Sequence, residues 1–305
     1  MEIKKNKSFY IGAFWKVLSC FFFSLVNGMV RFVTAGNEIN YLEEPIPFAQ
    51  VAFFQNFIGA ILLLPWVLRK SFSFKTTVLR LHFFRVLFAS SGLVLWYASL
   101  SYMPITQALA LSFTGPIMTV IVSKIYLKEP LSFFRIFSIL FSILGAFLII
   151  RPDKLFFKES IQETKWFYSL PLVSAICWVG SKVISRKIAQ NGDSPHLMTL
   201  YLLIFVTPIS FFPAFAIWES VSQIHFFWCV IIAITATMAH ISMSYALSLA
   251  EVTFLIPFGF ARLFLSGLIG YLVFDEIPNS AASWIGIFFI LISLLILSYD
   301  QTKKQ

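Results

Sequence analysis

The sequence predicts an all-α integral membrane protein. Of its 305 residues, 59% are hydrophobic and 12% are charged, whereas a soluble domain carries about 25% charged residues. A water-soluble fold of this length could not bury so much apolar surface. Runs of about 20 apolar residues, the length that crosses a bilayer as a helix, follow one another along most of the chain and leave no room for a soluble catalytic domain.

Ten apolar runs are long enough to form transmembrane helices. The first follows three lysines, as in a signal peptide, but it contains Lys16 and ends without a clear cleavage site, which favours a retained span. The longest connection, 152–166, is too short for a domain. The runs occupy approximately residues 11–33, 46–68, 81–102, 105–127, 132–150, 167–185, 196–217, 225–247, 252–274 and 281–299.

Basic residues are concentrated in alternate loops, which accounts for the net charge of +9. They precede the first span, gather in every second loop and return after the last span, whereas 152–166 mixes basic with acidic residues. By the positive-inside rule, both termini are then cytoplasmic. The charge describes topology and does not indicate nucleic-acid binding. Lys182, near the cytoplasmic end of the sixth span, is expected to snorkel toward the interface.

Two stretches of the chain repeat one another. Thr106 lies 23 residues before Glu129, and Thr253 lies 23 residues before Glu276. Each glutamate precedes a further apolar run, with a proline shortly after it. The repetition predicts two halves of five spans, and Glu129 is expected to compensate the N-terminus of the fifth span.

Asn27 and Gln55 are polar residues within apolar runs. Asn27 belongs to a stripe with Cys20, Ser24 and Arg31 at steps of three and four residues, so these side chains share one helix face. Such a face is costly against lipid. It either lines a cavity or packs helices together. Gln55 lies deep in the second run and is also expected to face inward.

Trp96, Tyr97 and Trp178 are aromatic residues with two interpretations. Trp96 and Tyr97 end the third run, where they form either an interfacial belt or a wall on which a ligand stacks. Trp178 shares a face of the sixth run with three serines. All three are retained as candidates for lining a cavity.

Arg262 and His240 are ionisable residues deep within apolar runs. A central arginine costs about 2.5–3.5 kcal/mol on insertion scales, and no carboxylate lies inside any run. Backbone carbonyls, water or a carboxylate of a bound compound could therefore neutralise Arg262. His240 lies on a face of small and polar residues and is either a packing residue or a cavity residue. It is the one candidate if transport depends on protons.

Pro116 and Pro257 interrupt the fourth and ninth runs. A proline removes one backbone hydrogen bond and bends a helix. In carriers, helices broken near the middle of the membrane often line the substrate site. Both residues are therefore hinge candidates.

The residues needed for enzyme chemistry are missing from the sequence. All fourteen acidic residues lie in loops or at the ends of runs. We find no paired aspartates, no zinc-type His/Glu pair and no phosphate-binding glycine loop. The three cysteines lie inside apolar runs without metal-like spacing. The sequence thus predicts no enzyme, no cofactor and no metal.

Small motifs follow one another in the same order in both stretches. In this order and spacing, the chain resembles the ten-span EamA-type carriers of the drug/metabolite transporter superfamily. The motifs are Arg85, Trp96–Tyr97–Ala98, Pro104, Ala108, Ala110, Pro116, Leu127–Lys128–Glu129, Gly145 and Arg151–Pro152 in the first copy, and Tyr245–Ala246, Pro257, Arg262, Gly270–Tyr271, Phe274–Asp275–Glu276 and Pro278 in the second.

The resemblance implies two inverted five-helix repeats, residues 1–151 and 167–305, joined by an extracytoplasmic connection at 152–166. A central cavity lies between them. The implied function is secondary transport of a small metabolite across the cell inner membrane by alternating access. Within the family the chain is most similar to S-adenosylmethionine uptake carriers, and amino acids or related metabolites are equal alternatives.

A membrane-embedded enzyme and a non-transporting scaffold are the alternatives from other functional classes. For a carrier, the expected partners are the lipid bilayer, the metabolite and a second copy of the chain as a homodimer. Pro116 and Pro257 are the expected hinges. The cavity is expected to be lined by Arg262, His240, Asn27, Gln55, Trp96, Tyr97, Trp178 and Tyr245.

Overall fold

In the computed structural model, every element of regular secondary structure among the described residues is a helix. Thr106 and Glu276, and most of the predicted connection at 152–166 and of the tenth span, lie outside those residues. The described residues are 2–34, 45–69, 76–103, 105, 108, 111–112, 114–129, 131–150, 165–274, 285–286, 288–290, 292–293 and 296.

The helices follow the predicted apolar runs. A π-helical turn, Ser123–Leu127, extends α5, and a 3₁₀ turn, Lys165–Tyr168, precedes α8. The helices are α1 (Glu2–Thr34), α2 (Phe48–Arg69), α3 (Leu79–Tyr102), α5 (Thr114–Val122), α6 (Phe133–Ile150), α8 (Ser169–Gln190), α9 (Pro195–Ala216), α10 (Gln223–Leu249), α11 (Val252–Gly259) and α12 (Ala261–Phe274).

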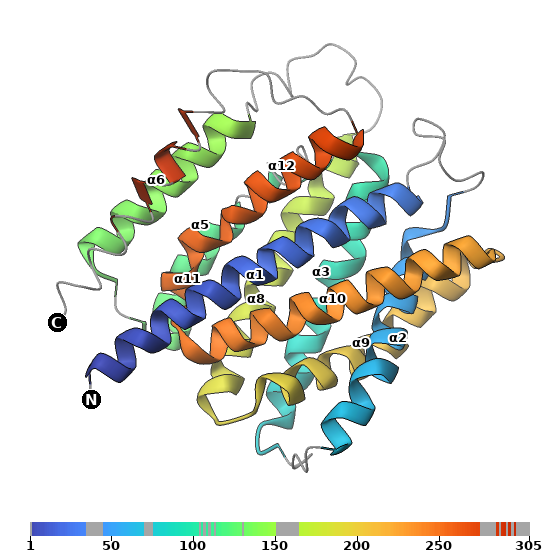
Figure 1. Ribbon diagram of the computed structural model, residues 1–305, viewed down its shortest axis with the longest axis horizontal. Helices are drawn as coiled ribbons and strands as arrows, with labels where there is room; N and C mark the ends of the chain where they lie inside the picture. Colours follow the sequence, from blue (N-terminus) through green and yellow to red (C-terminus); the bar gives the residue numbers. More distant parts are fainter. Residues whose placement is uncertain are drawn as a thin grey trace.

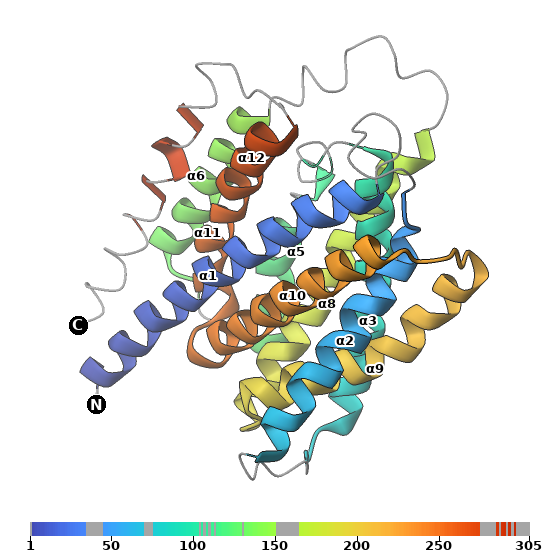
Figure 2. The same ribbon diagram turned by 45° about the vertical axis from the view of Figure 1, so that its right-hand side comes forward.

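The helices form two layers with a central core. Helices α1, α10 and α12 run side by side across one face, and α3, α5 and α8 lie behind them (Figure 1). Helices α2 and α9 pack together on one flank, while α6 lies on the opposite flank (Figure 2). The largest cluster of buried apolar residues lies between the layers and includes Trp96 and Tyr97.

Among the described residues, six segments are long and apolar enough to cross a membrane. They correspond to the predicted first, second, third, seventh, eighth and ninth spans, and the ninth comprises α11 and α12 together. The fourth and fifth spans appear as the shorter apolar helices Gly115–Leu127 and Phe133–Gly145. Helix α8 is less apolar because it carries basic residues and serines. The protein is therefore a multi-pass, all-helical membrane protein.

The ninth span is broken at its predicted weak point. Pro257 lies inside α11, which ends two residues later at Gly259. Phe260 connects it to α12, and its N–H donates to the carbonyl of Pro257 at 3.1 Å. Pro257 has no N–H to donate, so the helix tightens and restarts there.

The sequence predicted that Pro116 bends the middle of a continuous helix, and the structure differs. The chain turns at Ser112, and α5 begins at Thr114, so Pro116 lies in the first turn of α5. A first turn tolerates proline because its N–H groups have no partner within the helix. The break in the fourth span therefore precedes Pro116.

Glu129 caps a helix other than the expected one. Its carboxylate accepts hydrogen bonds from the N–H groups of Val252 and Thr253 at 2.9 and 3.0 Å, and from the Thr253 hydroxyl at 2.8 Å. These groups belong to the first turn of α11. The prediction that Glu129 compensates the fifth span is thus wrong, because its side chain reaches the free N–H groups of α11 instead.

Arg135 and Glu251 strengthen the same junction. Arg135 Nη1 lies 2.6 Å from Glu251 Oε2 and donates to the Thr253 hydroxyl at 3.0 Å. The Arg135 side chain is almost fully buried. The loop between α5 and α6 and the start of α6 are thereby fastened to the turn between α10 and α11.

Candidate substrate cavity

A cavity of about 220 Å³ lies between the two layers of helices. Its walls come from α1, α3, α5, α8 and α10 and from the broken segment α11–α12, and α2 and α9 contribute one residue each. It combines apolar and aromatic side chains with a small number of polar and basic ones, as ligand cavities generally do.

Asn27 organises one wall of the cavity. Its Oδ1 accepts a hydrogen bond from Arg262 Nη2 at 3.0 Å and a second from Trp96 Nε1 at 3.1 Å. The oxygen of one amide therefore orients both a cation and an indole. Asn27 Nδ2 and Arg262 Nε have no partner among the described residues.

Arg262 lies beside two aromatic rings. Its guanidinium carbon is 5.3 Å from the centre of the Phe23 ring and 5.4 Å from that of the Trp96 ring. Both distances are within the range of cation–π attraction, which partly replaces lost hydration. Neighbouring aromatic faces and Asn27 thus stabilise Arg262, and no ion pair with a carboxylate is found within the described residues.

Tyr97 and Gln55 form a buried pair at the cavity. The Tyr97 hydroxyl donates to Gln55 Oε1, which connects α3 to α2. Both side chains are almost completely buried. The pairing satisfies two polar groups and orients the Tyr97 ring.

Trp178 and His240 contribute two further rings to the cavity wall. A Cβ atom at Gly92 would lie 3.3 Å from atoms of the Trp178 indole, so the missing side chain of Gly92 makes room for that ring. His240 packs edge-on against Phe23, with ring centres 5.1 Å apart. Both residues line the cavity.

Tyr245 and Pro257 are the predicted site residues that do not line the cavity. The Tyr245 hydroxyl lies 2.7 Å from His196 Nε2, and its ring stacks on Trp15 with centres 4.8 Å apart. Pro257 lies within α11, while its neighbours Ile256 and Gly259 reach the cavity. Pro116 does line the cavity, as do the other seven candidates, Arg262, His240, Asn27, Gln55, Trp96, Tyr97 and Trp178.

The polar stripe of the first span serves both of its predicted purposes. Ser24 packs against α12, where it donates to the Arg262 carbonyl at 3.3 Å and accepts from Ser266 at 3.0 Å. Cys20 contacts the carbonyls of Phe258 and Gly259. Asn27, one turn further on, faces the cavity.

Three further basic residues, Lys16, Arg85 and Lys182, line the cavity. Arg85 is buried and donates to the Met198 carbonyl at 2.7 Å. Lys16 Nζ lies 3.7 Å from the Met243 sulfur. The expectation that Lys182 snorkels toward the membrane interface is wrong, because it lines the cavity.

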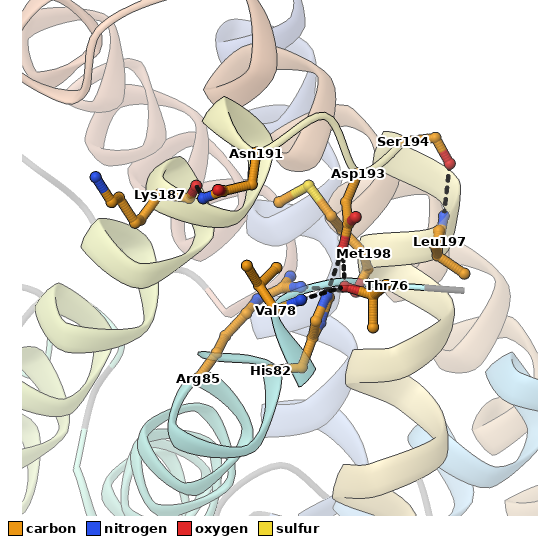
Figure 3. A network of polar contacts seen from close by, with 10 residues as sticks. All are labelled: Thr76, Val78, His82, Arg85, Lys187, Asn191, Asp193, Ser194, Leu197 and Met198. Atoms are coloured by element: carbon orange, nitrogen blue, oxygen red, sulfur yellow. Dashed lines mark hydrogen bonds and ion pairs between the residues drawn. The ribbon is translucent and has the colours of Figure 1, made fainter. Parts of the chain in front are cut away.

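A polar network fastens α3 beside Arg85. His82 is fully buried, and its Nε2 lies 2.8 Å from Asp193 Oδ2. Thr76 donates to the same carboxylate oxygen at 2.8 Å. Figure 3 shows these groups converging from α3 and from the turn between α8 and α9. The network fixes the end of α3 from which Arg85 projects.

Residues 10–151 match the EamA-like transporter family. This part of the chain therefore belongs to that family. Its members are transporters, so the protein is a membrane transporter and not an enzyme.

Similar proteins extend the match beyond those residues. A riboflavin transporter of Vibrio cholerae is 28% identical over 299 residues, covering 96% of this chain and 95% of its own. An S-adenosylmethionine uptake transporter of Rickettsia bellii is 24% identical over 300 residues, covering 98% and 97%. One crystal structure has a TM-score of 0.72 at 15% identity, covering 98% of this chain and 99% of its own, which shows a shared fold.

In this EamA-like protein, the spacing of two lysines along their helices indicates that they face the cavity. Lys16 lies four residues before Cys20 and therefore continues the polar stripe of the first span. Lys182 lies four residues after Trp178 and shares its face. Lys182 was assigned to membrane topology because it lies toward the end of its apolar run.

Proposed function

We propose that this EamA-like protein is a secondary transporter of the cell inner membrane that moves a small metabolite by alternating access. The observation that carries the proposal is the cavity between the two layers of helices, where aromatic walls surround Asn27 and Arg262. A polar cavity inside a multi-pass membrane protein is costly unless it serves a solute.

We further propose ten spans in two inverted halves, 1–151 and 167–305, joined by 152–166 outside the cytoplasm and with both termini inside. The helix contacts support this arrangement because they occur in matched sets. Helix α1 packs on α10 as α8 packs on α3, and α1 packs on α12 as α8 packs on α5. Exchanging each helix for its counterpart in the other half turns one contact into the other.

Riboflavin and S-adenosylmethionine are the first substrates to consider, because they appear in the names of similar proteins. Amino acids and related metabolites are the alternatives. Arg262 is proposed to bind an acidic or carbonyl group of the substrate through its remaining donors. Trp96, Tyr97, Trp178 and His240 are proposed to surround its apolar part.

The break between α11 and α12 is the proposed hinge, together with the turn before Pro116. Both lie at the cavity; the first joins α11 to α12, and the second directly precedes α5. Rotation at these points would open one end of the cavity and close the other. At the α10–α11 turn, the contacts of Glu129 and Arg135 would hold one end closed.

Transport in liposomes tests the function. Purified protein is reconstituted and uptake or exchange of labelled riboflavin, S-adenosylmethionine and amino acids is measured. We expect flux of one of these classes. Arg262→Gln should reduce that flux to about one tenth, which is the effect of losing one hydrogen bond from a charged group. Absence of flux for every compound would reject the carrier. The homodimer stays a prediction, which light scattering of the purified protein tests.

A further inference from the structure

The cavity holds an excess of positive charge that its own lining does not balance. Lys16, Arg85, Lys182 and Arg262 all line it, and no carboxylate is found among the lining residues that the structure describes. Burying cations away from water is unfavourable unless opposite charge or hydrogen-bond acceptors compensate them. The important question is which of the four already have such partners.

The two arginines are partly satisfied by the protein. Arg85 donates to the Met198 carbonyl at 2.7 Å, and Arg262 donates to Asn27 at 3.0 Å and lies beside two aromatic rings. These contacts fix the guanidinium groups in place. The two arginines therefore have fixed orientations in the cavity wall in addition to carrying charge.

The two lysines are much less satisfied. Lys16 is almost buried, and its ammonium contacts only the Met243 sulfur, a weak acceptor, at 3.7 Å among described polar groups. No described residue accepts a hydrogen bond from Lys182. Lys16 and Lys182 line the same cavity as Arg262. Three basic side chains thus line one cavity, and two of them have few acceptors from the protein.

We propose that the cavity selects a planar heteroaromatic compound that carries an anionic group, a carboxylate or a phosphate. Lys16 and Lys182 hold the anionic group, and the ring lies against the walls formed by Trp96 and Trp178. Ammonium groups bind phosphate and carboxylate as point charges with several donors. Indole faces favour contact with another flat ring. This inference rests on the proposed transport function and specifies its substrate class.

The same charges disfavour a cationic substrate. S-adenosylmethionine carries one carboxylate against an ammonium and a sulfonium group, so its net charge is positive. In a cavity of low polarity, like charges repel more strongly than in water. We therefore expect S-adenosylmethionine to bind less tightly than an anionic ring compound.

Matched pairs of ligands test the proposal directly. Binding to the full-length protein in detergent is measured by calorimetry for riboflavin and riboflavin 5′-phosphate, nicotinamide and nicotinate, and adenosine and adenosine monophosphate. In at least one pair we expect the anionic member to bind about tenfold more tightly, the effect of one charge-assisted hydrogen bond. Equal or tighter binding of the neutral member in every pair, or no binding by any anion, would overturn the proposal.

Lysine variants locate the effect. Lys16→Gln and Lys182→Gln should each remove most of the preference, whereas Lys182→Arg should keep it. Lys187→Gln is the matched control, because Lys187 lies on the same helix but is exposed. If both glutamine variants keep the same preference for the anionic ligand as the control, Lys16 and Lys182 do not hold the anionic group. If those variants fold poorly, added salt on the unmodified protein should reduce the preference.

The test separates this inference from the transport function. A carrier that moves neutral riboflavin as well as riboflavin 5′-phosphate would contradict anion selection and leave transport intact. Binding that prefers anions, together with no flux of any compound in liposomes, would support the site and reject the carrier.

Discussion

The side-chain oxygen of Asn27 controls the local geometry of the cavity. It accepts from Arg262 and Trp96 at once, so the guanidinium and the indole are held at fixed positions by one atom. Arg262 is in turn placed beside the rings of Phe23 and Trp96. A site built in this way is organised before the substrate arrives, which lowers the entropy lost on binding.

Replacing Asn27 by alanine should release both donors. We expect affinity for the transported substrate to fall about tenfold, since a buried donor that loses its acceptor costs about 1–3 kcal/mol. The measurement is the concentration dependence of uptake in liposomes. Thr235→Ala is the control, because the Thr235 hydroxyl bonds only to its own helix, at Ile231. A variant with wild-type affinity would show that Asn27 does not organise the site.

Gly92 offers a second test at the scale of single residues. Its backbone lies against the Trp178 indole, and a valine there would displace the ring. We expect Gly92→Val to weaken substrate binding while the protein still folds. Gly267→Val provides the control, since a Cβ atom at Gly267 meets no atom of a neighbouring element within 4 Å. Equal binding by the two variants would remove Trp178 from the proposed aromatic wall.

At the scale of elements, the start of α11 depends on a carboxylate from a distant part of the chain. Glu129 lies 123 residues before Val252, yet it receives two N–H groups from the first turn of α11. Inside a membrane protein, those groups have little water to bond instead. The cap therefore joins the α5–α6 loop to the broken ninth span.

Glu129→Ala should lower the thermal stability of the protein in detergent. The substitution leaves two N–H groups and the Thr253 hydroxyl without their acceptor, which corresponds to about 1–3 kcal/mol. Glu129→Gln keeps one acceptor oxygen and should lose less. The exposed Glu219, changed to alanine, is the control. A melting temperature of Glu129→Ala equal to that of the control would contradict the capping role.

Helix α6 packs closely against the described residues of the tenth span. Ser138 donates to the Ser293 carbonyl at 2.7 Å, and a Cβ atom at Gly145 would lie 2.5 Å from the Gly286 carbonyl oxygen. We expect Gly145→Ala to lower the melting temperature, because a backbone atom must move to accommodate the methyl group. Gly267→Ala, which meets no neighbouring atom, is the matched comparison and should leave the melting temperature nearly unchanged.

At the scale of the whole molecule, the matched helix contacts support two structurally related halves. The topology that we propose for them assigns opposite sides of the membrane to successive turns. The α8–α9 turn at Asn191 is expected to be cytoplasmic, and the loop at Glu219 between α9 and α10 is expected to lie outside. Both residues are exposed in the structure.

Cysteine labelling checks this topology. In a variant without the native cysteines, Glu219→Cys should react with a membrane-impermeant maleimide added to intact cells, and Asn191→Cys should react only after the membrane is opened. The reverse pattern would invert the proposed orientation. Labelling of both positions from outside would break the alternation of the spans.

The sequence predicted the class of fold and much of the cavity, but it failed where a residue had two plausible explanations. Arg262 and Asn27 were identifiable because a polar group deep in an apolar run is rare. Lys182 was misassigned because a lysine toward the end of a span also fits membrane topology. The partner of Glu129 could not be inferred, because no local pattern connects residues so far apart.

The cap provided by Glu129 also has a consequence for how the protein is made. The ribosome delivers this carboxylate long before it delivers Val252 and Thr253, so an acceptor is already in place when the first turn of α11 enters the bilayer. A gene divided within 152–166 would separate donor from acceptor. One polypeptide would then carry the Glu129 carboxylate without its donors, and the other would carry the N–H groups of Val252 and Thr253 without their acceptor. We expect the two to be stable in the cell only when they are produced together.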